Sequence, residues 1–254
     1  MPDKDDTRLI APVDLYAALG LLTRVPVRVD AGAAVSRGAG SAWAYPLVGA
    51  MLGFVGAVLV SVLVSLGLTA GVVAGLLLAF GIIVTGAMHE DGLADSADGL
   101  WGGWERSRRL EIMKDSHIGV YGVCAVGLSL VLRWATLVVV VEMGAYWAVL
   151  IAVGALSRAA MVVVMASLPN ARGDGLSRSV GRPAARTMWL GVAIAVAFAL
   201  VSGLPESIAI AAFATLACAL IAKAKIGGQT GDILGATQQV TEIVLLAAVV
   251  ASIT

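Results

Sequence analysis

Residues 70–99 read AGVVAGLLLAFGIIVTGAMHEDGLADSADG, so an apolar run ends abruptly in a cluster of acidic residues. The apolar part is close to the roughly 20 residues that an α-helix needs to cross the hydrocarbon core of a membrane. Four carboxylates, Glu90, Asp91, Asp95 and Asp98, follow it within nine positions. Carboxylates are costly beside hydrocarbon, so this cluster indicates chemistry or transport. We therefore expect the functional site in this segment.

The composition is that of an integral membrane protein. Of the 254 residues, 59% are hydrophobic and only 13% are charged, whereas soluble domains carry about 25% charged residues. The chain has 17 basic and 17 acidic residues, and this balance argues against a nucleic-acid partner. Cys124 and Cys218 lie in separate apolar runs and are expected to be packing residues, not a disulfide or a metal site.

Seven apolar runs predict an all-α polytopic membrane protein with about seven transmembrane helices. A further stretch, residues 12–22, is a candidate interfacial helix on the membrane surface. We expect one membrane domain over residues 1–254, with a cytoplasmic N-terminal segment (1–43) and an acidic helix-turn-helix (89–118) between the second and third spans. The predicted spans are residues 46–67, 70–88, 119–141, 143–166, 187–204, 207–222 and 233–254.

Lysine and arginine gather in alternate loops. The N-terminal segment and the loops at 89–118, 167–186 and 223–232 hold 15 of the 17 basic residues. The turns near residues 68, 142 and 205 hold none. By the positive-inside rule, the N-terminus and the acidic loop are cytoplasmic, and the C-terminus lies on the other side of a prokaryotic inner membrane.

The acidic cluster predicts a site for a hard divalent cation. On a helix, Asp91, Asp95 and Asp98 lie at i, i+4 and i+7 and share one face. Carboxylates on one stripe repel one another unless a cation lies among them, and oxygen ligands favour Mg²⁺ or Mn²⁺. With Glu90, these residues are the predicted metal ligands. The alternative is a solvated acidic turn.

A second acidic pair follows a Gly-Gly turn. Glu111 and Asp115 have i, i+4 spacing on a predicted helix over about residues 104–115. If this helix faces the first cluster, the two could hold a pair of divalent ions, which clamp the attacking and leaving oxygens in phosphoryl transfer. The sub-pattern DSADG at 95–99 also resembles the signature of CDP-alcohol phosphotransferases, although the later spacing of that signature is not reproduced.

Longer blocks resemble the cobalamin synthase family, the adenosylcobinamide-GDP ribazoletransferases. HEDGLADSADGLWGG at 89–103 and LEIMKDSHIGVYG at 110–122 carry most of the resemblance. His117 departs from it, because many family members have Arg at this position. The remaining blocks follow in the expected order along the chain: LTRVPV at 22–27, YPLVG at 45–49, LSRA at 156–159, LPNARGDGL at 168–176 and GGQTGDILGA at 227–236.

The resemblance implies a reaction. The adenosylcobinamide phosphate group would pass from adenosylcobinamide-GDP to α-ribazole, or to its 5′-phosphate, with release of GMP and use of Mg²⁺. His89 is then the best-placed general base, and Asp115 is the second candidate. For His89 the structural alternative is an interfacial hydrogen-bonding residue. The number of metal ions and the oligomeric state stay open.

Basic residues near the acidic segments are candidates for phosphate contact. Lys114 could instead balance Glu111 on a solvated helix face, and Arg172 could simply follow the positive-inside rule. Arg158 lies inside a predicted span, so it must face a cavity or a carboxylate, with Asp232 and Glu242 as its plausible partners. We expect a substrate-binding contribution from Glu111, Lys114, Arg158, Arg172, Asp232 and Glu242.

Two other function classes compete with this interpretation. An ion-coupled transporter also uses intramembrane carboxylates, but its sites lie near mid-membrane between inverted repeats, and no repeat is evident here. A CDP-alcohol phosphotransferase would leave the blocks outside the acidic loop unexplained. The predicted partners are therefore the two small-molecule substrates and the lipid bilayer.

Overall fold

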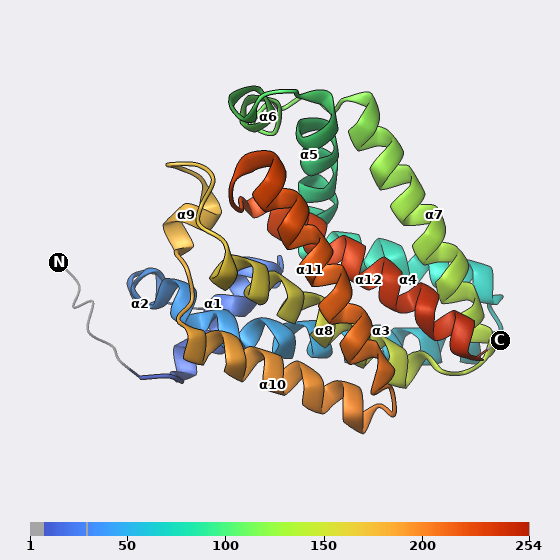
Figure 1. Cartoon of the computed structure of the whole chain (residues 1–254). Helices are drawn as coiled ribbons and strands as arrows, with labels where there is room; N and C mark the ends of the chain where they lie inside the picture. The colour runs from blue at the N-terminus through green and yellow to red at the C-terminus, as the bar shows by residue number, and fades with distance from the viewer. Residues whose placement is uncertain (1–7, 29, 254) are drawn as a thin grey trace.

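The computed structural model describes residues 8–28 and 30–253, and within them the chain is helical with no β-strand. The all-α prediction is confirmed, while Lys4 and Thr254 lie outside the described residues. The elements (Figure 1) are α1 (Pro12–Leu22), α2 (Ala31–Arg37), the 3₁₀ helix η1 (Gly38–Ala44), α3 (Tyr45–Ser65), α4 (Ala70–Thr85), α5 (Met88–Gly102), α6 (Arg106–Ile112), α7 (Val120–Glu142), α8 (Tyr146–Ser167), α9 (Leu176–Val180), α10 (Ala185–Val201), α11 (Glu206–Ile226) and α12 (Gly231–Ile253).

Each of the seven predicted spans coincides with a helix. Among the described residues, α7, α8, α11, α12 and the helical stretch that ends with α3 are long and apolar enough to cross a membrane. Helix α4 has 16 residues and α10 has 17, so each is shorter than the usual span. Helix α4 passes the same test only together with α5, from which it is separated by an 87° bend.

The bend between α4 and α5 is made by two residues in the left-handed region. Gly86 has φ 64° and Ala87 has φ 57°. Glycine adopts this conformation freely, but for alanine it costs roughly 1–2 kcal/mol. The chain therefore turns sharply where the apolar run ends, and the acidic helix α5 runs almost at right angles to α4, packed against α12 and α7 (Figure 1).

The predicted alternation of loops is visible in the arrangement of the helices. Figure 1 shows α5, α6, α9 and the turn between α11 and α12 gathered toward one end of the molecule. The turns that follow α3, α7 and α10 lie toward the opposite end, with the C-terminus. These are the turns that lack Lys and Arg. The basic loops thus share one end of the bundle, which we call the basic end.

The bundle is centred on α8, which crosses α3 at very short range. A Cβ atom added to Gly49 would overlap the carbonyl of Gly154, and one added to Gly154 would overlap the carbonyl of Gly49. Gly53 approaches the backbone at Leu150 in the same way. Small residues let helix backbones approach this closely in lipid.

Replacement of Gly154 by alanine should therefore lower the stability of the protein by about 1–3 kcal/mol, because neither backbone can move aside. Gly127 on α7 is the matched control, since a Cβ atom there meets nothing within 4 Å. Gly127→Ala should be neutral or stabilising. Thermal unfolding in detergent checks both, and equal melting temperatures for the two variants would contradict the close crossing.

Candidate functional site

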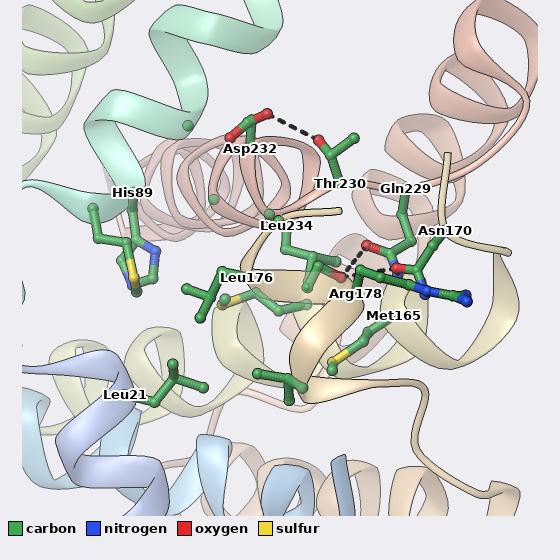
Figure 2. A pocket seen from close by; sticks show the side chains of 18 of the residues that line it. Leu21, His89, Met165, Asn170, Leu176, Arg178, Gln229, Thr230, Asp232 and Leu234 are labelled. Carbon is green, nitrogen blue, oxygen red and sulfur yellow. Dashed lines mark hydrogen bonds between the residues drawn. The ribbon is translucent and has the colours of Figure 1, made fainter. Parts of the chain in front are cut away.

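Two cavities meet at His89, near the first turn of α5. The outer cavity, of about 220 Å³, lies between α1, α5, α8, the segment 170–180 and the start of α12 (Figure 2). The inner cavity, of about 100 Å³, lies within the bundle between α3, α4, α7, α8 and α12. His89 lines both. Of the other predicted site residues, Asp91, Arg172 and Asp232 line the outer cavity, and Glu90, Arg158 and Glu242 line the inner one.

Carboxylates from two helices meet at the outer cavity. Asp91 of α5 and Asp232 of α12 line it. Asp95 is half-buried one turn further along α5. Burial, then the negative charges of Asp232 and Asp91, raise the pKa of Asp95 from 3.8 to about 7, although the positive charge of Arg172 opposes the shift. This is a site with an excess of negative charge.

Glu90 does not belong to this group. Its Oε1 atom accepts hydrogen bonds from Nη2 of Arg133 at 2.9 Å and from Nε2 of Gln239 at 3.1 Å, and the side chain lines the inner cavity. Adjacent residues on a helix point about 100° apart, so Glu90 and Asp91 face different sides of α5. The predicted role of Glu90 as a metal ligand beside Asp91 therefore stays a prediction, and our proposal does not use it.

Asp98 is engaged by the start of α7. Its two carboxylate oxygens accept hydrogen bonds from the backbone N–H groups of Gly119, at 2.7 Å, and Gly122, at 2.9 Å. The first N–H groups of a helix lack partners within the helix, and a carboxylate there also interacts favourably with the helix dipole. Asp98 therefore fastens α5 to α7, and its predicted place among the metal ligands is not supported.

The four predicted ligands thus do not form one cluster. In the described part of the chain, no group of three or more His, Cys, Asp and Glu side chains is placed to hold a metal ion. Asp91 and Asp232 remain together at the outer cavity, and both interact electrostatically with Asp95. Asp232 comes from α12, which the sequence analysis assigned to substrate binding.

The buried charges of the inner cavity form a network across four helices. Arg133 of α7 bridges Glu90 of α5 and Glu242 of α12, at 2.9 and 3.3 Å. Arg158 of α8 lies 3.5 Å from the other oxygen of Glu242. The predicted pairing of Arg158 with a carboxylate is confirmed, and the partner is Glu242. Neither arginine reaches the outer cavity.

Two loops that carry the family-like blocks are joined at the rim of the outer cavity. Asn170 and Gln229 form an isolated parallel bridge, and Nε2 of Gln229 donates to Oδ1 of Asn170 at 2.7 Å. Next to this bridge, Arg172 lies 3.1 Å from Asp232. Figure 2 shows Asp232 and Thr230 on one side of the cavity, with Asn170, Gln229 and Arg178 beside them. Arg172 is therefore the basic residue placed at the carboxylate group.

The second acidic pair faces away from α5. Helix α6 contacts α5 through Arg109 and Met113, which meet Gly99 at close range. Glu111 and Asp115 consequently point outward, and both side chains are more than half exposed. The possibility that this pair faces the α5 carboxylates is therefore not realised, and neither residue lines a cavity.

The partners of the outward-facing residues are on the surface. Glu111 pairs with Arg108 at 2.8 Å. Lys114 pairs with Asp174 at 2.5 Å, and this hydrogen bond lowers the pKa of the Asp174 carboxyl. Asp115 pairs with His117 at 2.7 Å, which lowers the pKa of Asp115. The roles predicted for Glu111, Lys114 and Asp115 stay predictions, and our proposal does not use them.

His89 has the surroundings of a reactive group. It is 1% exposed, and neither ring nitrogen has a hydrogen-bond partner among the described residues. Burial lowers its pKa well below 6.5, and the charges of Arg158 and Arg133 lower it further. The ring is therefore neutral at pH 7 and has a free acceptor nitrogen.

Sequence reasoning missed several residues of the two cavities. Tyr45, Met161 and Met165 line the outer cavity, but in an apolar helix they look like ordinary core residues. Arg133 was not assigned a role because an arginine within a span can extend toward the membrane surface. The sequence does contain a signal for Arg133, and it is the same as for Arg158: a basic residue inside an apolar run indicates a cavity or a carboxylate partner.

Comparisons with known proteins identify the family. The model of the family described as "Cobalamin-5-phosphate synthase" matches residues 14–250. A relative from Bradyrhizobium diazoefficiens, named adenosylcobinamide-GDP ribazoletransferase, is 42% identical, covering 92% of this chain and 91% of its own. Two further relatives carry the same name. The one from Azorhizobium caulinodans is 41% identical, covering 94% of this chain and 95% of the relative. The one from Sinorhizobium medicae is 38% identical, covering 94% of this chain and 97% of the relative. No solved structure matches.

The family match covers the acidic helix, the two joined loops and nearly every span. It agrees with the apolar helices in assigning a multi-pass membrane protein. The resemblance of the sequence blocks to this family is confirmed: the chain belongs to the cobalamin-5-phosphate synthase family, and these three relatives are named adenosylcobinamide-GDP ribazoletransferases.

Proposed function

We propose that this protein is an adenosylcobinamide-GDP ribazoletransferase that works with Mg²⁺ at the outer cavity. A hydroxyl oxygen of α-ribazole, or of its 5′-phosphate, forms a bond to the phosphorus that carries the cobinamide group. The bond from that phosphorus to the GMP oxygen breaks, and GMP leaves. The hydroxyl proton is lost in the same step, so the products are adenosylcobalamin, or its phosphate, and GMP.

The observation that carries this proposal is the meeting of Asp91 and Asp232 beside Arg172 at the outer cavity, close enough to Asp95 for their charges to raise its pKa. Mg²⁺ is usually held by one or two carboxylates, with water and substrate phosphates as its other ligands. Asp91 and Asp95 fit that pattern, because neither forms an ion pair with a basic side chain of the described residues, and Arg172 pairs with Asp232 instead. Bound there, Mg²⁺ would neutralise the pyrophosphate and polarise the reacting phosphoryl group.

The remaining residues have roles that follow from their positions. Arg172 can form a charge-assisted hydrogen bond to a phosphate oxygen of the substrate if its ion pair with Asp232 opens. His89 lies between the two cavities with a free ring nitrogen, so it is the candidate to accept the proton of the attacking hydroxyl. Glu242 and Arg158 act from the inner cavity, through the network that holds α5.

The basic end of the bundle is the side that we assign to the cytoplasm of the cell, by the positive-inside rule. The outer cavity lies at this end, between α5 and the joined loops. Both proposed substrates are water-soluble, so an opening toward the cytoplasm suits them. We accordingly assign the protein to the cytoplasmic (inner) membrane of a prokaryote.

The direct test uses the purified protein in detergent with adenosylcobinamide-GDP and α-ribazole. With Mg²⁺ we expect GMP and adenosylcobalamin to appear in equal amounts, and with EDTA we expect neither. The 5′-phosphate of α-ribazole is tested in parallel to identify the preferred acceptor. If folded protein gave no corrinoid product with either acceptor, the proposed function would be wrong, and CDP-alcohol substrates would be tested next.

A further inference from the structure

One side of the outer cavity is apolar. Leu21 and Leu22 of α1 and Met161 and Met165 of α8 line it, and Met88 adds a third methionine. The chain has eight methionines in all, so three of them meet at one small cavity. Figure 2 shows Leu21 and Met165 on the side opposite Asp232. We call Leu21, Leu22, Met88, Met161 and Met165 the methionine floor.

The methionine floor has features of a surface for an aromatic ring. Methionine is flexible and polarisable, and its sulfur makes favourable contacts with aromatic rings. Two polar groups without partners also lie at this cavity. They are the hydroxyl of Tyr45, in a side chain that is 2% exposed, and the ring of His89. Buried polar groups of this kind normally have a hydrogen-bond partner, so both groups are available to a molecule bound in the cavity.

The size of the cavity limits what it can enclose. Pockets for drug-sized ligands have volumes of roughly 300–1,000 Å³, and the outer cavity has about 220 Å³. A corrin macrocycle with its side chains is larger than such a ligand and must stay outside. A single flat aromatic base fits the available volume, and its ribose would extend toward the carboxylate side.

We propose that the methionine floor binds the aromatic base of the ribazole acceptor, with the Tyr45 hydroxyl as a hydrogen-bond partner at its edge. This subsite rests on the proposed function, because it assigns the acceptor to one side of the same cavity. The ribose hydroxyl then lies between the base and the side lined by Asp91 and Asp232. The adenosylcobinamide-GDP phosphates approach that side from the cavity opening.

The main test combines a smaller side chain in the methionine floor with a larger aromatic base on the acceptor. Met165→Ala should raise the KM for α-ribazole at least about tenfold, as expected when apolar contact is lost in a specificity pocket. The KM for adenosylcobinamide-GDP should change less than about twofold. The same variant should prefer an acceptor whose benzimidazole carries two ethyl groups in place of two methyl groups, because the extra volume fills the space left by Met165.

Met113→Ala is the matched control. Met113 is also 2% exposed and belongs to the same core cluster, but it does not line the cavity. It should leave the preference between the two acceptors unchanged. A merely structural effect of Met165→Ala would lower the activity with both acceptors alike and would not reverse their order.

Tyr45→Phe tests the polar edge without changing the packing. The hydroxyl has no partner within the described residues, so its removal leaves no buried group unpaired. We expect a KM for α-ribazole about three to ten times higher, with an unchanged melting temperature.

The outcomes separate the subsite from the reaction. If the wild-type protein forms product but Met165→Ala raises the KM of adenosylcobinamide-GDP instead, the floor belongs to the donor and the subsite is wrong. Unchanged KM values for both substrates in Met165→Ala and Tyr45→Phe would also overturn it. Absence of product from the wild-type protein with every acceptor would instead contradict the proposed function itself.

Discussion

Asparagine in place of Asp95 should lower kcat/KM for adenosylcobinamide-GDP by about 10²–10³-fold, the scale of losing one electrostatic contact to the transition state. Burial, followed by the negative charges of Asp232 and Asp91, raises the pKa of Asp95 to about 7. The amide retains the shape of the side chain but cannot compensate a cation. The remaining activity should require a higher Mg²⁺ concentration, which an Mg²⁺ titration of initial rates measures.

Two comparisons show that the effect belongs to the cation site. Glu105→Gln changes an acid at the same end of the molecule, but its side chain is exposed and forms no ion pair with the described residues, so activity should change less than about twofold. In EDTA, Asp95→Asn should melt no lower than the wild type, because it removes repulsion and breaks no hydrogen bond. An Asp95→Asn variant with an unaltered rate and Mg²⁺ requirement would exclude Asp95 from the site.

Much of the fold follows from hydropathy alone. Residues 12–22 were predicted as a helix and form α1, with the same bounds. The seven apolar runs and the charge alternation also agree with the structure, because a helix in lipid must satisfy its backbone within one continuous apolar segment. The role of α1 was less predictable: Asp14 is fully buried and bonds to Arg37 and Trp43, so α1 is fixed to η1.

The direction of α5 could not be read from the sequence. Its acidic residues predict a helix, but the 87° bend depends on the left-handed conformations of Gly86 and Ala87. Alanine gives no indication of such a conformation, since it favours right-handed helix in most contexts. Without the bend, the stripe of Asp91, Asp95 and Asp98 has no defined neighbours, and the contribution of Asp232 beside it stays hidden.

The candidate site illustrates the same limit at the level of single residues. Spacing correctly grouped Asp91 with Asp95, because residues four apart share a helix face. Glu90 was grouped with them as a metal ligand, but adjacent residues such as Glu90 and Asp91 do not share a helix face. Asp98 keeps the right face, but the backbone N–H groups of α7 occupy it, and that contact joins residues more than 20 positions apart. Spacing within one helix carries no information about such partners.

The largest effect on stability should come from Arg133. Arg133→Met leaves Glu90 and Glu242 buried without their main cation. Breaking a buried ion pair from one side typically costs about 3–5 kcal/mol. Methionine retains much of the apolar length of the side chain, so the loss reports charge and hydrogen bonding more than packing. Unfolding of the purified protein in mixed detergent should show this loss directly.

Arg186→Met is the matched control for this substitution. Arg186 is exposed at the start of α10 and has no ion pair with the described residues, so its replacement should change stability by less than about 0.5 kcal/mol. If both variants unfolded at the same detergent composition, the network in the inner cavity would contribute nothing to stability.

A second substitution distinguishes charge balance from the loss of any one contact. The network contains two arginines and two glutamates, so Arg133→Met leaves one excess negative charge. Glu90→Gln removes that charge, and the double variant should recover a large part of the lost stability. It should not recover activity, because the Arg133–Glu90 bridge that ties the first turn of α5 to α7 is still missing. Recovery of stability without activity would therefore assign Arg133 to the positioning of the acidic helix, whereas recovery of both would show that α5 is positioned without the Arg133–Glu90 bridge.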